Sequence, residues 1–190
     1  MNDPDSQRGG ADAPSVRIAT TSLAGCFGCH MSILDIDEKL IDLVELVSFD
    51  RSPLTDIKRV GDCDIGIIEG GLANEENVEV LREFRRHCRV LIAMGACALN
   101  GGVPALRNQF SVAEILRESY VDGIGVENPH IPAGEDLPRL LNQVIPVHQV
   151  VRVDYMLPGC PPRADEIWAV LSALLEGREP QLPAQLVNYD

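Results

Sequence analysis

Four of the six cysteines in this chain have a spacing that suits metal binding. Cys26 and Cys29 form a C-x-x-C pair, whereas Cys97 and Cys160 stand singly, far along the chain. Each of these three segments follows an apolar or β-branched run. Four thiolates that meet in one place make a four-sulfur site, which suits zinc or an iron–sulfur cluster. We therefore expect these four cysteines to be metal ligands.

Glycines lie close to all of the expected ligands. Gly25 and Gly28 lie around the C-x-x-C pair, Gly95 comes shortly before the third ligand, and Gly159 directly precedes the fourth. An inorganic cluster needs the backbone to approach closely and N–H groups to point at its sulfur atoms. A residue without a Cβ permits both. We expect these four glycines to surround the cluster behind its ligands.

The spacing also discriminates between the candidate sites. Common zinc ribbons pair two C-x-x-C knuckles, whereas here one knuckle is joined by two isolated cysteines from separate loops. A thioredoxin-type dithiol would use Cys26 and Cys29 but would leave the other two cysteines unexplained. An iron–sulfur cluster is therefore the favoured interpretation. A structural zinc site and a redox dithiol are the alternatives.

The segments that must position the cysteines alternate between strands and helices. Buried-strand patterns cover residues 16–21, 44–49, 64–68, 89–94 and 150–156. Helical patterns run from 31 to 43, over 75–88 and over 111–120, and a last helix stops at Gly177. The alternation predicts an α/β fold, a flavodoxin-like doubly wound parallel sheet, in a single domain over 15–178. A flexible arm (1–14) and a tail (179–190) would flank it.

This fold would bring the cysteines together, because ligands in such sheets bind beyond the carboxyl ends of the strands. Cys26 and Cys29 follow the first predicted strand, Cys97 follows a central one, and Cys160 follows the last. All three loops should open at one edge of the sheet. Cys88 lies on the apolar stripe of a predicted helix and Cys63 has no partner at ligand spacing, so we expect both to be buried and inert.

Composition excludes several classes of function. The chain has 190 residues and a net charge of −13, which disfavours nucleic acid as a partner. No apolar run approaches the roughly 20 residues that cross a bilayer. The polar opening resembles no secretory leader, so we expect a cytoplasmic protein. In that reducing compartment the cysteines should not form a disulfide framework.

Four motifs occur in the order seen in the small subunit of NiFe hydrogenases. The resemblance runs from about residue 16 to residue 177, nearly the whole chain. The motifs are Gly25-Cys-Phe-Gly-Cys29, Glu69-Gly-Gly71, Gly95-Ala-Cys-Ala98 with the following Gly101-Gly-Val-Pro104, and Pro158-Gly-Cys-Pro-Pro162. The resemblance implies that Cys26, Cys29, Cys97 and Cys160 hold one 4Fe-4S cluster. It also implies that the NiFe site lies on a separate large subunit, so that this chain relays electrons and holds no catalytic residue.

The short form of the chain resembles cytoplasmic, NAD-linked bidirectional hydrogenases. The longer small subunits have a twin-arginine leader and a C-terminal extension that ligates further clusters. The resemblance implies diaphorase partners that carry FMN and iron–sulfur clusters, and the overall reaction H2 + NAD+ = H+ + NADH. The homologous 20 kDa subunit of quinone reductases, which has adjacent cysteines in place of the C-x-x-C pair, is the alternative within electron transfer. A zinc-stabilised binding module without redox work is the alternative from another class.

Three further features at the same edge have two interpretations each. Glu69 ends a buried strand, where a carboxylate must be paired or hydrated. It either caps the turn or faces the cluster, where it would move protons or ligate the oxidised cluster. His30 either forms a hydrogen bond near the cluster or is an ordinary loop histidine. FMN would suit a flavodoxin-like sheet, with Thr20, Thr21 and Ser22 at the strand end, but the cysteine pair occupies that loop, so FMN is disfavoured.

Overall fold

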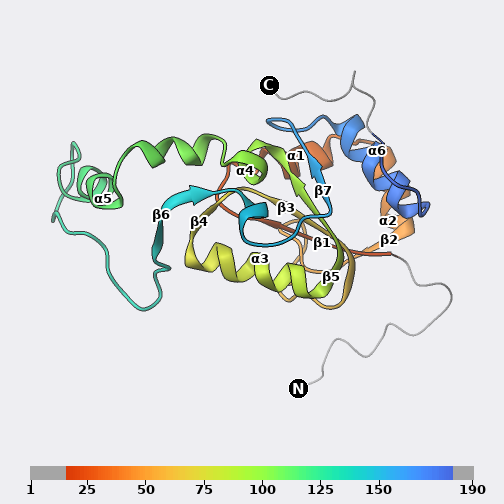
Figure 1. Cartoon of the computed structure of the whole chain (residues 1–190), viewed down its shortest axis with the longest axis horizontal. Helices are drawn as coiled ribbons and strands as arrows, with labels where there is room; N and C mark the ends of the chain where they lie inside the picture. The colour runs from red at the N-terminus through yellow and green to blue at the C-terminus, as the bar shows by residue number, and fades with distance from the viewer. Residues whose placement is uncertain (1–15, 182–190) are drawn as a thin grey trace.

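The computed structural model of this chain describes residues 16–181. Its centre is a five-stranded sheet in the order β2-β1-β3-β5-β7, in which all neighbouring strands are parallel (Figure 1). The strands are β1 (Val16–Ser22), β2 (Val47–Phe49), β3 (Cys63–Glu69), β5 (Cys88–Met94) and β7 (Tyr155–Leu157). If only these five strands are numbered in chain order, the order becomes 2-1-3-4-5, which is that of flavodoxin-like folds. The predicted fold class is confirmed.

Helices cover both faces of the sheet. The helices of the described residues are α1 (Gly28–Leu34), α2 (Lys39–Leu46), α3 (Glu75–His87), α4 (Gly95–Asn100), α5 (Val112–Tyr120) and α6 (Ala164–Leu175), with 3-10 turns η1 (Val103–Gln109) and η2 (Val147–Gln149). Successive residues of a strand point to opposite faces. Ile18 accordingly packs into the layer built with α1, α2 and α6, whereas Ala19 packs into the layer built with α3 (Figure 1). The sheet is therefore doubly wound, as predicted.

Two helix predictions were wrong in detail. The helix expected from 31 to 43 is divided into α1 and α2, and Asp37 between them has a left-handed backbone (φ 64°). Cys88, expected on the apolar stripe of a helix, is the first residue of β5. It is buried as expected, but because its strand packs in the core layer beneath α3 and not because it lies on a helix face.

The last strand is shorter than the predicted 150–156. Only Tyr155–Leu157 pairs with β5. The β-branched residues before it, Val150, Val151 and Val153, pack against the α3 layer without belonging to a strand. Their pattern therefore indicates burial and not strand pairing.

A second, two-stranded antiparallel sheet was not predicted. It joins β4 (Leu72–Asn74) to β6 (Leu140–Ile145) beside the main sheet. Asn142 and Gln143 in β6 are polar and exposed, so the strand has no continuous apolar run by which it could be predicted. From this small sheet the segment that holds α5 extends away from the body of the molecule (Figure 1).

Some expectations fall outside the described residues. The arm predicted over 1–14 lies wholly outside them, and the predicted tail lies outside them from residue 182 onward. Among the helices that the structure describes, none has the length and apolar character needed to cross a bilayer.

Candidate metal centre

The four predicted ligands come together at one edge of the main sheet. Cys26 and Cys29 lie after β1, Cys97 lies in α4 after β5, and Cys160 lies after β7. All four are free and line a single small cavity at the carboxyl ends of these strands. Cys29 and Cys97 are half-buried, whereas Cys26 and Cys160 are exposed. The fold therefore produces the convergence that the loop positions predicted.

Backbone hydrogen bonds restrain all three segments that carry the cysteines. The N–H of Ala96 donates to the carbonyl of Gly159 (2.8 Å), which joins the Cys97 and Cys160 loops. Ala24 and Gly71 exchange two hydrogen bonds (2.8 and 3.0 Å), which fasten the C-x-x-C loop to the end of β3. The site is therefore built on cross-linked loops, which keep its ligands in fixed relative positions.

Glycine is required at two positions because of the thiols. Gly95 has a left-handed backbone (φ 85°), and a Cβ there would overlap the Sγ of Cys29. Gly102 is also left-handed (φ 48°), and a Cβ there would lie 2.7 Å from the Sγ of Cys97. Gly102 was not predicted as a site residue, although the Gly-Gly-Val-Pro sequence around it was a usable signal. The remaining predicted glycines line the cavity: Gly25, Gly28 and Gly159.

The surroundings of the half-buried thiols favour their neutral forms. Burial raises the pKa of the Cys29 thiol far above its usual range, and the negative charge of Glu69 raises it further. Burial also raises the pKa of the Cys97 thiol, with a smaller contribution from Cys160. Since thiolates are the metal-binding form, a cationic centre next to Cys29 and Cys97 would stabilise their deprotonated forms.

Glu69 and His30 form a buried pair beside the cavity. Glu69 lines the cavity, its Oε2 accepts the N–H of Cys29 (2.9 Å), and its Oε1 is 2.8 Å from Nδ1 of His30. Although burial alone would raise the pKa of the Glu69 carboxyl, hydrogen bonds from His30 and Ser22 hold it below its ordinary value. His30 is fully buried in α1, so the interpretation as an ordinary loop histidine was wrong.

Cys63 and Cys88 form a disulfide, which was not predicted from the sequence. They are register partners on β3 and β5, with Cα atoms 4.6 Å apart. Both cysteines are buried, as expected. Their bond was missed because they lie 25 positions apart in the sequence and only strand pairing brings them together. The disulfide lies at the opposite ends of these strands from the four free cysteines.

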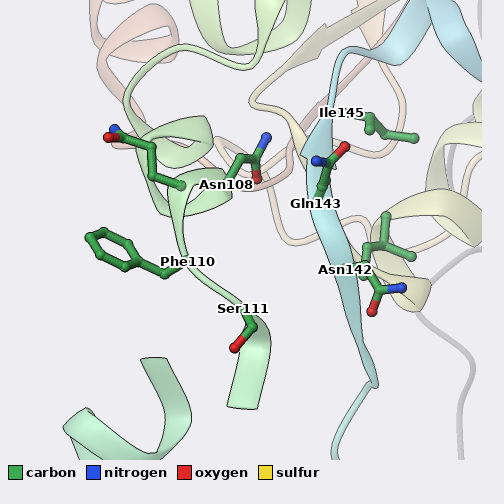
Figure 2. A pocket seen from close by; sticks show the side chains of 8 residues that line it. Asn108, Phe110, Ser111, Asn142, Gln143 and Ile145 are labelled. Atoms are coloured by element: carbon green, nitrogen blue, oxygen red, sulfur yellow. The ribbon is translucent and has the colours of Figure 1, made fainter. Parts of the chain in front are cut away.

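A second pocket, about 730 Å3, has a lining that shares no residue with the cysteine cavity. It opens between β6 and the segment that carries Asn108, Phe110 and Ser111 (Figure 2). Asn108 is engaged there with the backbone N–H and carbonyl of Val144 (2.7 and 2.9 Å). The lining holds amides, a hydroxyl and apolar groups but no thiol or charged side chain, so it offers no metal chemistry.

The donor set at the sheet edge fits an iron–sulfur cluster. It consists of four free thiols, and glycine keeps two of them clear of backbone substituents. Within residues 16–181, no three His, Cys, Asp or Glu side chains are arranged to hold one metal ion. A cluster does not need all its ligands to converge on one ion, because each cysteine binds a different iron.

Comparisons with known proteins identify the family. Residues 26–174 match the family model described as NADH ubiquinone oxidoreductase, 20 Kd subunit. The chain is 46% identical to the delta subunit of the NAD-reducing hydrogenase HoxS of Cupriavidus necator, over 92% of this chain and 86% of that one. It is 39% identical to a subunit of the F420-non-reducing hydrogenase vhu of Methanococcus voltae, over 92% of this chain. It spans only 61% of that longer relative.

A solved structure gives the same result. The fold matches a chain in the crystal structure of an NAD+-reducing [NiFe]-hydrogenase in the H2-reduced state with a TM-score of 0.92 and 56% identity. The match covers 93% of this chain and all of that one. The resemblance to NiFe hydrogenase small subunits is thereby confirmed. The chain belongs to the family of the 20 Kd subunit of NADH ubiquinone oxidoreductase, and within it to the small subunits of hydrogenases.

Proposed function

We propose that this chain is the electron-transfer small subunit of an NAD-reducing NiFe hydrogenase. The observation that carries the proposal is the gathering of four free cysteines from three loops at one sheet edge. It occurs in a chain that matches NAD-reducing hydrogenase subunits over nearly its whole length. The complex would catalyse H2 + NAD+ = H+ + NADH. The reaction of H2 would belong to the large subunit, so this chain contributes no catalytic residue to it.

Cys26, Cys29, Cys97 and Cys160 would hold one 4Fe-4S cluster, which accepts and passes on single electrons when bound. The chain's own residues bind it and control its surroundings. Gly95 leaves space for the Cys29 thiol, and the loop hydrogen bonds keep the ligands in place. Binding the cluster and controlling its surroundings are therefore the tasks of the protein, whereas the electron transfer itself belongs to the cluster.

The exposed side of the site supports a partner there. Cys26 and Cys160 are exposed, and so are Met31 in α1 and Met156 in β7, the helix and strand next to these cysteines. Exposed cysteines and apolar side chains next to one another are typical of a surface that another subunit covers. We assign this edge to the large subunit. The diaphorase subunits, with FMN and further iron–sulfur clusters, would accept the electrons, and a cytoplasmic location stays a prediction.

The test is purification of the intact complex from its source, followed by analysis of iron, acid-labile sulfide, nickel and zinc and identification of every copurifying chain. We expect iron and sulfide, nickel on a large subunit, and H2-dependent reduction of NAD+. Zinc in place of iron and sulfide would contradict the cluster and favour a zinc-stabilised binding module.

A quinone-reductase relay is the second candidate, because the matching family model is described by a subunit of NADH ubiquinone oxidoreductase. Its cysteine pair would be adjacent, whereas Phe27 and Gly28 separate Cys26 from Cys29. Copurification with a membrane module and quinone-dependent oxidation of NADH, without nickel, would establish this candidate.

A further inference from the structure

A continuous chain of buried polar side chains leads from β1 to the cluster site. Ser52 Oγ lies 2.7 Å from Thr20 Oγ1, which lies 2.9 Å from Nε2 of His30. The other ring nitrogen, Nδ1, lies 2.8 Å from Glu69, which accepts the N–H of Cys29. The side chains of Ser52, Thr20, His30 and Glu69 are all buried. Buried polar groups that form a complete network hold one arrangement rigidly.

The directions of these hydrogen bonds follow from the chemistry of the end group. A carboxylate can only accept, so Nδ1 of His30 donates to Glu69. In the neutral imidazole Nε2 then accepts from the hydroxyl of Thr20, which in turn accepts from Ser52. Ser52 Oγ also accepts the N–H of Leu54 (3.2 Å). With a neutral ring this assignment satisfies every group, and the two bonded ring nitrogens fix the orientation of the His30 side chain.

The ring of His30 is also fixed by its packing. It stacks on Phe27, with ring centroids 4.7 Å apart and an angle of 8° between the planes. Phe27 lies inside the C-x-x-C sequence and has a left-handed backbone (φ 68°). His30 therefore joins the cysteine loop to β1 and β3 through three different contacts, two polar and one aromatic.

We infer that His30 is a positioning residue, which holds the Glu69 carboxylate against the Cys29 end of the site and thereby sets the reduction potential of the bound cluster. The inference rests on the proposed function. Charge beside a cluster and the hydrogen bonds around its sulfur ligands both change its potential. Here the N–H of Cys29 is given to Glu69, and His30 donates to the same carboxylate. His30 thus controls how much negative charge the site experiences.

The arrangement also bears on the prediction that Glu69 ligates the oxidised cluster. Both carboxylate oxygens already accept hydrogen bonds, one from His30 and one from Cys29. Each oxygen retains a second lone pair, so these two hydrogen bonds are compatible with ligation. With both bonds in place, Glu69 acts on the cluster through charge and hydrogen bonding.

The experiment is a redox titration of the purified complex, followed by electron paramagnetic resonance, with iron content measured on the same samples. Glu69→Gln removes the charge and should shift the cluster potential to a more positive value. His30→Leu removes the donor that offsets this charge and should shift the potential to a more negative value. His30→Asn, whose amide can donate from nearly the position of Nδ1, should restore most of the wild-type potential and spectrum. Exposed His148, changed to Asn, is the matched control and should leave both unchanged.

Potential shifts of opposite direction in Glu69→Gln and His30→Leu separate this inference from a merely structural effect. A structural effect would lower the iron content of both variants without shifting the potential in opposite directions. Unchanged potentials, or shifts of one sign in both variants, with iron retained would overturn it. If His30→Leu loses iron, Thr20→Val decides, because it removes only the hydroxyl that orients the ring. Thr20→Val should shift the potential in the negative direction by less, and an unshifted potential would refute the inference. Absence of iron and sulfide from the wild-type complex would instead refute the proposed function.

Discussion

The two ends of the central sheet contain cysteines in two different chemical states. At the carboxyl end, Cys26, Cys29, Cys97 and Cys160 lie just beyond the ends of β1, β5 and β7 and stay free. Cys29 and Cys97 lie in the first turns of α1 and α4. At the amino end, Cys63 and Cys88 begin two adjacent strands and form a disulfide. The residue type is the same, so the position relative to the strand decides which chemistry is available.

The geometry of pairing explains the difference. Register partners on adjacent strands have side chains at a short, fixed separation, so a direct sulfur–sulfur bond forms without further movement. Thiols on loops that follow different strands are brought only to a common cavity, where a metal centre is needed to join them. The carboxyl end is thus suited to binding, and the amino end to stability.

The amino end is also stabilised by an ion pair between side chains. Asp154, just before β7, accepts hydrogen bonds from Arg85 (2.6 Å) and from the N–H of Leu91 (2.8 Å). The same arginine donates to the carbonyls of Cys88 and Arg89 (2.6 and 2.9 Å). These contacts tie the end of α3 to the starts of two strands.

The largest expected effect follows from removing a ligand. Cys97→Ser replaces a thiol of the carboxyl end with a hydroxyl, a poor ligand for iron, so the cluster should be lost or converted and NAD+-coupled oxidation of H2 should fall to background. Iron content, the cluster spectrum and turnover of the purified complex check this. A Cys97→Ser complex with the wild-type spectrum and turnover would show that Cys97 is not a ligand.

A smaller effect is expected from Gly95→Ala, which leaves every ligand present. The new Cβ would overlap the Cys29 thiol, so metal retention should weaken by about 10- to 100-fold, the range for residues around metal ligands. Iron retained after dialysis against a chelator measures it. Gly134→Ala is the matched control, since a Cβ there meets nothing within 4 Å, and equal iron loss in both variants would contradict the account.

The disulfide should affect stability but not the cluster. Changing Cys63 and Cys88 together to Ala opens a loop of 25 residues, which should lower the free energy of unfolding by roughly 3 kcal/mol. Urea unfolding of the oxidised full chain measures this, while iron content in the complex should stay unchanged. Loss of iron in the double variant would show that the two ends are not independent.

The smallest effect is expected at the ion pair of the amino end. Burial alone would raise the pKa of the Asp154 carboxyl, but the hydrogen bonds from Arg85 and Leu91 hold it below its ordinary value. Asp154→Asn should therefore lower the free energy of unfolding at pH 7 by roughly 1.5 to 3 kcal/mol. Because the pKa of Asp154 is lower in the folded chain, its carboxylate stabilises the fold at any pH above the pKa of Asp in the unfolded chain, about 3.9. This contribution disappears as the pH falls through the pKa of the folded chain.

Urea titrations of wild-type and Asp154→Asn chains at pH 7 and at decreasing pH test the sign. The difference in stability between the two chains should be largest at neutral pH and should shrink below about pH 4. A difference that is constant with pH would show that the effect comes from packing and not from the carboxylate charge.

Much of the site was predictable because it depends on strand ends. Apolar runs locate the strands, and in a parallel sheet their carboxyl ends must meet, so Cys97 and Cys160 could be assigned to one edge from local patterns. Glu69 was located in the same way, at the end of β3. The partners of His30 were not predictable, because burial of a polar ring depends on what packs around it. β6 was missed because two consecutive exposed polar residues, Asn142 and Gln143, interrupt its apolar run.

Residue type and periodicity, read along the chain, determined the α/β architecture, the edge at which the thiols gather and the family to which the motifs point. Tertiary structure alone decided that Cys63 bonds to Cys88 and that His30 is held between Thr20 and Glu69. The physical reason is distance along the chain. Contacts across 25 and 39 residues depend on strand register and helix packing, and local sequence patterns do not contain either.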